Sequence, residues 1–193
     1  MQDILSLYLC VKFVKTIKKK NLVIHSTFVL IVFASKNVDQ FRAQIETLAA
    51  DWAKTGTMVT DAATEVNTLI SDLTSLQDSM TVPTGSKMAA DATAMLDSLK
   101  NGYMAQVQGL GTIAGEITGF TEKWTAMTAD VDALSAGLKD GKLEGDVMAK
   151  VTELNDAVKA ATTSVDGWKT AAAAAKEAAM SMYNMYKEKS MAK

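Results

Sequence analysis

Apolar residues recur every three or four positions along three long stretches of this 193-residue chain. In the first stretch the pattern runs from Val38 to Met80 without a change of phase, with Thr55 filling one position of the repeat. A period of 3.5 residues keeps one narrow stripe of a helix facing its neighbours, as in left-handed coiled coils. Because Gly56 does not reset the phase, one continuous helix is predicted over residues 37–80.

Two further stretches repeat the same stripe, and they predict helices over residues 87–139 and 143–190. The first connection, TVPTGS, holds the only proline of the chain, and Ser86 is placed to cap the second helix. In the second connection, KDGKLEGD, Gly141 is predicted to end the second helix. Short connections between long helices favour alternating directions, so we predict an all-α fold, a long antiparallel up-down-up three-helix bundle of the coiled-coil type.

The two connections also predict which residues share a level in the bundle. Pairing Met80 with Met88 across the first connection places Trp52 level with about residue 116, and the second connection places Trp168 at nearly the same level. The two tryptophans are therefore expected to meet as one central layer of the core. A ligand pocket lined by these rings is the less favoured alternative.

A different pattern precedes the first helix, because residues 22–34 are uncharged and mostly apolar and follow three consecutive lysines. This run covers about 20 Å as a helix, which is less than the roughly 30 Å of a bilayer core. A basic segment, a short apolar segment and small residues are the parts of a secretory signal, so cleavage is predicted between Ala34 and Ser35. The alternatives are an uncleaved anchor and, less favoured, a core helix. Residues 1–34 are thus assigned to an N-terminal extension plus signal peptide, and residues 35–193 to the three-helix bundle.

The composition of residues 35–193 excludes much of enzyme chemistry. Cys10 and His25, the only cysteine and histidine, both precede the predicted cut. Nucleophile systems that use His or Cys, thiolate metal sites and Glu-x-x-His di-metal sites therefore have no ligands or bases here. Catalysis by carboxylates alone would need a paired, buried acid and base, whereas the carboxylates fall mostly at positions expected to face water. We predict that the chain is no enzyme and binds no cofactor.

The charge of residues 35–193 argues against a nucleic-acid partner. These residues carry 15 Lys and Arg against 21 Asp and Glu, which gives a net charge of −6. An acidic chain without a basic run does not attract a phosphate backbone.

One candidate interaction feature is a weakly charged outer face on the second predicted helix. Gly111, Gly115 and Gly119 recur there at every fourth position, with Met104 on the same face. Such a row of small residues permits close approach of another helix. The favoured interpretation is that these glycines are tolerated in water. The alternative hypothesis is that this face docks a partner helix or a second copy of the protein.

A second feature is the methionine-rich chain end, MSMYNMYKEKSM. Thioethers suit Cu(I), which makes Met180, Met182 and Met185 candidate ligands in an exported protein. Methionine also fills irregular apolar gaps and forms adaptable binding surfaces, and plain packing is the favoured interpretation. In the predicted bundle Met80, Met88 and Met95 lie at this same end.

Together these features predict an exported structural or interaction protein, located in the periplasm or envelope or secreted, that binds a protein partner or itself. The first alternative is a membrane-active or lipid-binding helical bundle resembling a pore former. A methionine-rich Cu(I)-binding protein is the second. If residues 22–34 stay uncleaved, they are expected to contact a membrane.

Overall fold

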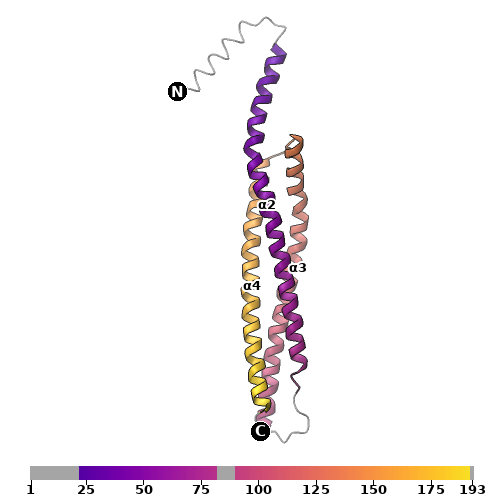
Figure 1. The fold of residues 1–193 in the computed structure, drawn as a ribbon, viewed down its shortest axis with the longest axis vertical. Helices are drawn as coiled ribbons and strands as arrows, with labels where there is room; N and C mark the ends of the chain where they lie inside the picture. The colour runs from indigo at the N-terminus through magenta and orange to yellow at the C-terminus, as the bar shows by residue number, and fades with distance from the viewer. Residues whose placement is uncertain (1–21, 82–89, 192–193) are drawn as a thin grey trace, which may run out of the picture.

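A computed structural model describes residues 22–81 and 90–191, with side chains described from residue 41 onward in these ranges. Three helices follow one another: α2 spans Leu22–Asp78, α3 spans Ala90–Asp140 and α4 spans Val147–Met191 (Figure 1). No strand occurs in the described ranges, so the all-α prediction is confirmed. Helix α2 passes through Gly56 without a break, as the apolar pattern predicts, and it also continues across Ala34 and Ser35. Residues 1–21 of the predicted leader lie outside the described residues.

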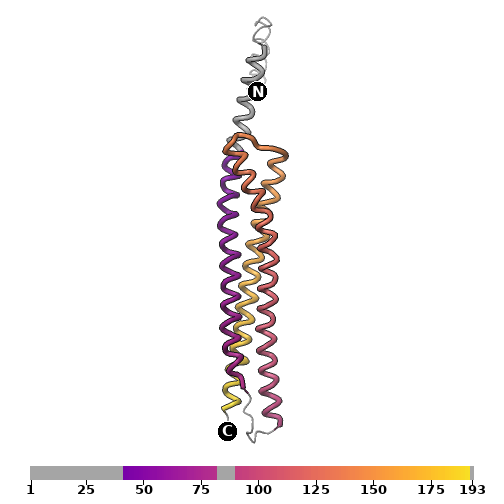
Figure 2. The backbone as a smooth tube through the Cα atoms, turned by 90° about the vertical axis from the view of Figure 1, so that its right-hand side faces the viewer, coloured from indigo at the N-terminus to yellow at the C-terminus, as the bar shows by residue number. Residues whose placement is uncertain are grey.

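The three helices lie side by side in both Figure 1 and Figure 2, and each helix contacts the other two. Trp52 of α2 stacks on Trp124 of α3, whereas Leu73, further along α2, accepts a hydrogen bond from Tyr103, which comes earlier in α3. Residue numbers therefore rise along α2 as they fall along α3.

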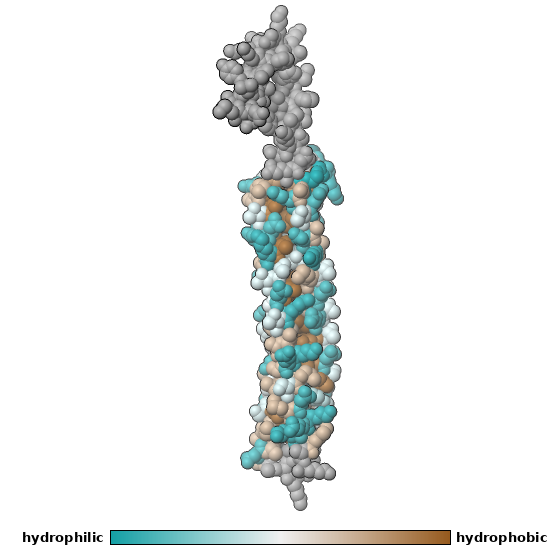
Figure 3. Space-filling model, turned by 60° about the vertical axis from the view of Figure 1, so that its left-hand side comes forward, coloured by the Kyte–Doolittle hydropathy of each residue, from teal (hydrophilic) through white to brown (hydrophobic). Residues whose placement is uncertain are grey.

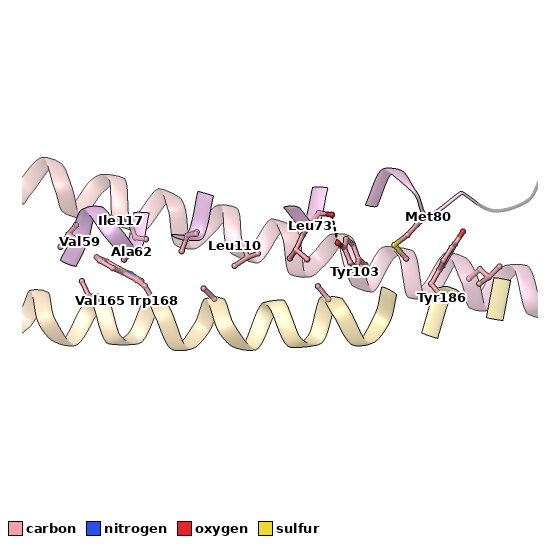
Figure 4. Close-up of a cluster of buried hydrophobic side chains, with 14 residues drawn as sticks. Val59, Ala62, Leu73, Met80, Tyr103, Leu110, Ile117, Val165, Trp168 and Tyr186 are labelled. Atoms are coloured by element: carbon pink, nitrogen blue, oxygen red, sulfur yellow. Dashed lines mark hydrogen bonds between the residues drawn. The ribbon is translucent and has the colours of Figure 1, made fainter. Parts of the chain in front are cut away.

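The predicted apolar stripe is the core of the molecule. Every stripe residue from Phe41 onward within the described ranges is buried or half-buried, and Thr55 is buried among them. The buried residues form two clusters along the axis, of which Figure 4 shows the one that contains Leu73, Leu110 and Trp168. On the face drawn in Figure 3, hydrophobic side chains appear as a narrow line between hydrophilic ones.

The expectation that Trp52 and Trp168 share one layer is wrong, because the two rings belong to different core clusters. Trp52 stacks on Trp124, with ring centroids 3.7 Å apart and planes 10° apart, instead of lying level with residue 116. Trp168 packs edge-on against Phe120 with ring centroids 5.4 Å apart.

The physical reason lies in the first connection. Met80 lies beside Lys100, whose Nζ donates a hydrogen bond of 2.9 Å to the Met80 carbonyl oxygen. Met80 therefore lies level with a part of α3 later in the chain than expected, and α2 sits about two turns further along α3. Met88 and the predicted Ser86 cap lie outside the described residues.

The second connection agrees with the prediction that Gly141 ends α3. Gly141 has a φ of +66°, Lys142 N donates to Gly137 O at 2.8 Å, and Gly141 N donates to Leu138 O at 3.3 Å, which is the Schellman pattern. Helix α4 begins at Val147, later than the expected residue 143. The delay follows from Gly145, at φ +72°, and from the N-cap Asp146, whose carboxylate accepts a hydrogen bond from the backbone N–H of Ala149 at 3.0 Å.

Candidate functional site

The outer face of α3 is fixed by the residues that α3 buries. Leu110 and Ile117 are buried one heptad apart, and this places Gly111, Gly115 and Gly119 on the opposite side of the helix, where all three are exposed. A Cβ atom added to any of the three would meet no other atom within 4 Å. These glycines are therefore not needed for packing within the described part of the chain.

Met104 is half-buried and lies one heptad before Gly111, on the same side of α3. The sequence pattern thus places all four candidate residues on adjoining parts of one helix surface. We call this surface, formed by Met104, Gly111, Gly115 and Gly119, the α3 outer face.

The α3 outer face is nearly free of charge. Between residues 101 and 121 the only charged residue is Glu116, and its carboxylate accepts a hydrogen bond of 3.1 Å from the indole N–H of Trp168, toward α4. The exposed hydroxyls of Thr112 and Thr118 donate to carbonyl oxygens one turn earlier in α3, at 3.4 and 2.9 Å. Their donor protons are therefore already used within the helix, which lowers the cost of covering this face with another surface.

Three other glycines of the bundle lie in tight contacts, whereas Gly109 and Gly167 are exposed and, like the row, have nothing within 4 Å of an added Cβ atom. A Cβ atom on Gly102 would lie 2.9 Å from Met182 Sδ, and one on Gly137 would lie 2.8 Å from the Lys142 carbonyl oxygen. At Gly56 the nearest atom is Trp124 Nε1, at 3.2 Å. Close approach explains these three glycines, whereas nothing within the described part of the chain explains the row on the α3 outer face.

The methionines of the chain end lie where α2 finishes and α4 ends, near Met80. Met80 is buried, and Met180 and Met182 are half-buried against the core cluster shown in Figure 4. Met185 and Met191 are exposed, at 40% and 67%.

The proposed Cu(I) ligands do not share one environment. Met180 and Met182 are two residues apart in α4 and so leave the helix about 200° apart. Met182 lies against Gly102, while Met185, one turn later, is exposed. Copper binding stays a prediction, and the described residues contain no group of three or more His, Cys, Asp or Glu that could hold a metal ion.

A pocket of about 380 Å³ lies at the α3–α4 connection, and its lining includes Asp130, Leu134 and Lys150. Lys150 Nζ donates to Asp130 Oδ2 and to Glu153 Oε2, each at 3.0 Å. The hydrogen bonds to Asp130 and Glu153 raise the pKa of Lys150 above its usual value. The hydrogen bond to Asp130 links α4 to α3.

Two buried tyrosines lie near the methionine end. Burial, and then the charge of Tyr183, raises the pKa of Tyr103, whose hydroxyl donates to the Leu73 carbonyl oxygen at 2.6 Å. Burial, and then the charge of Asp97, raises the pKa of Tyr186, whose hydroxyl has no hydrogen-bond partner among the described residues.

The apolar pattern does not predict the hydrogen bonds and ion pairs between the helices. The Asp130–Lys150 pair could have been found, because both residues stand ten positions from residue 140 at the predicted turn. The contact of Lys100 with Met80 could not, because it depends on how far α3 extends past the end of α2.

No protein-family model, no curated protein and no solved structure matches this chain. Within the described ranges, no helix has a stretch long and apolar enough to cross a membrane.

Proposed function

We propose that this chain is an exported structural or interaction protein. In this proposal residues 35–193 form a long antiparallel up-down-up three-helix bundle that binds a protein partner or a second copy of itself. Contacts in opposite residue order along α2 and α3 support the antiparallel arrangement. Between α3 and α4, the pairs Asp130–Lys150 and Glu116–Trp168 support it in the same way. Export is proposed from the lysines and the apolar run before Ala34.

The observation that carries the binding proposal is the glycine row of the α3 outer face. Each exposed glycine inside a helix costs about 1 kcal/mol relative to alanine, so the row lowers the stability of α3 without a packing reason in the described part of the chain. Glycines at every fourth position let the backbone of another helix approach closely. A docked helix would bury this uncharged face. Its binding would explain why α3 carries three glycines there although they weaken the helix.

The test is the double substitution Gly111→Leu with Gly115→Leu. Both glycines are exposed, and a Cβ atom added at either position meets nothing within 4 Å. Leucine is also a better helix former than glycine, so folding should be preserved or improved. Its side chain would hold a docked helix away from α3. Sedimentation velocity and co-purification should therefore show the complex for the wild-type protein and its loss for the double variant.

The matched control is Gly167→Leu on α4, another exposed glycine with nothing within 4 Å. This substitution adds the same side chain outside the α3 outer face and should leave association unchanged. The proposal is contradicted if the double variant keeps both the sedimentation coefficient and the co-purifying proteins of the wild type.

A further inference from the structure

The thioether of Met182 occupies space that Gly102 leaves open where α4 packs on α3. A Cβ atom on Gly102 would lie 2.9 Å from Met182 Sδ and 3.3 Å from Met182 Cε. Met182 is half-buried and packs against the core cluster that contains Leu110 and Tyr103. Its sulfur is therefore part of the α3–α4 contact, with no spare room on the Gly102 side.

This level of the molecule connects all three helices. The Tyr103 hydroxyl of α3 donates to Leu73 of α2, and the Tyr103 ring lies 6.3 Å from the ring of Tyr183, the residue after Met182 in α4. The hydroxyl of Ser79, the residue after the end of α2, donates a hydrogen bond of 3.3 Å to the Tyr183 hydroxyl. A displacement of Met182 would disturb contacts that hold α2, α3 and α4 together.

Three other methionines at the same end are exposed, whereas Met182 is half-buried. Met95 is 44% exposed, Met185 is 40% exposed and Met191 is 67% exposed. Because these side chains are exposed, an oxygen atom added to their sulfurs is expected to cost less packing than one added to Met182. These residues provide an internal comparison for Met182 within the same molecule.

We propose that Met182 is an oxidation site whose modification loosens this end of the bundle. A hydroperoxide transfers one oxygen atom to the Met182 Sδ lone pair; the O–O bond breaks, the S–O bond forms, the sulfur is oxidised by two electrons, and the peroxide is reduced to water or an alcohol. The product, a sulfoxide, is polar and larger than the thioether. Over Gly102, the added oxygen is either buried without a donor or forces the side chain outward, which leaves a gap. Both outcomes remove contacts between α3 and α4.

The different exposures predict an order of events. Met95, Met185 and Met191 react at low peroxide dose without a structural effect, and Met182 reacts at higher dose with one. Because methionine sulfoxide is reduced enzymatically, the loosening should be reversible. This property concerns the methionine end and does not depend on the α3 outer face.

The test is a hydrogen peroxide titration of the full chain, with each sulfoxide quantified by peptide mass spectrometry and Tm measured by circular dichroism. The Tm should stay constant while Met95, Met185 and Met191 are oxidised, and it should fall by about 2–4 °C as Met182 sulfoxide accumulates. Treatment with methionine sulfoxide reductases should restore it.

Two variants separate the effect of Met182 from that of general oxidation. Met182→Leu conserves side-chain volume without the sulfur, so its Tm should not fall over the same dose range. Met185→Leu, at the exposed position one turn later, should lose Tm as the wild type does. Each variant is compared with its own untreated sample, so a change in starting stability does not affect the result. The proposal is overturned if wild-type Tm is unchanged when most Met182 is sulfoxide, or if Met182→Leu shows the same fall.

Discussion

Replacing Gly111, Gly115 and Gly119 together by alanine should stabilise the isolated chain. All three positions lie inside α3, are exposed, and have nothing within 4 Å of an added Cβ atom. Alanine then brings the full gain in helix propensity, about 1 kcal/mol per site relative to glycine, with no steric cost. The sum is about 2–3 kcal/mol, which corresponds to a rise in Tm of about 5–10 °C for a chain of this size.

The comparison variant is Gly102→Ala, at which the same propensity gain meets a contact. Its new Cβ atom would lie 2.9 Å from Met182 Sδ, so the thioether must move away and lose part of its packing. Gly102→Ala should stabilise the chain less than a single alanine substitution on the α3 outer face does, or should destabilise it.

The assay is urea and thermal unfolding by circular dichroism, at several protein concentrations so that any contribution of self-association appears as a concentration dependence. A triple variant that is no more stable than the wild type at the lowest concentration would refute the reasoning.

Three further predictions concern contacts away from the α3 outer face. Burial raises the pKa of Tyr103 and of Tyr186, so the folded chain favours the neutral hydroxyls. The stability should be full below the ordinary pKa of 10.0 and should fall as the pH rises through the raised pKa values. Replacing both tyrosines by Phe should make this fall smaller in urea unfolding measured at several pH values. Lys150→Met should lower Tm slightly through loss of the Asp130 contact, and the difference should shrink in about 1 M salt because the pair is partly exposed. Gly141→Ala forces a Cβ atom into a φ of +66° and should cost about 1 kcal/mol in urea unfolding; an unchanged midpoint would contradict the assigned helix stop.

The sequence predicted the core of this protein well because burial follows from a regular period. The repeat of 3.5 residues identified buried positions as different as Leu48, Thr55 and Ala161 without knowledge of their neighbours. Gly141 could also be predicted as the end of α3, since a glycine followed by polar residues is a frequent helix stop.

The relative level of the helices was predictable only where the connection is short. Trp168 lies within hydrogen-bond distance of Glu116, close to its expected level, because the connection after Gly141 fixes the register of α3 and α4. Trp52 lies against Trp124 and not at the expected level, because the composition of the first connection does not determine how far α3 extends beyond Met80. A periodic stripe predicts that two helices pack together, but it repeats every heptad and so cannot define their register.

The sequence predicted that the candidate site is exposed, but it did not predict what the site binds. The spacing of Gly111, Gly115 and Gly119 relative to Leu110 and Ile117 places the row outside the core, and the structure has these glycines exposed. The proposed partner was not predictable, because the spacing of residues within one chain carries no information about a second molecule.

The most direct measurement of the central claim is site-specific photo-crosslinking from the α3 outer face in the natively expressed protein. A photoreactive residue at Thr112, which is exposed between Gly111 and Gly115, is compared with the same residue at Thr163, an exposed position on α4. Both threonines donate to carbonyl oxygens of their own helices, at 3.4 and 3.1 Å, so the two replacements remove equivalent contacts. The account predicts that position 112 crosslinks to another protein or to a second copy of the chain, and that position 163 does not. Equal crosslinking from both positions, or none from position 112, would contradict the proposal that this face binds a partner.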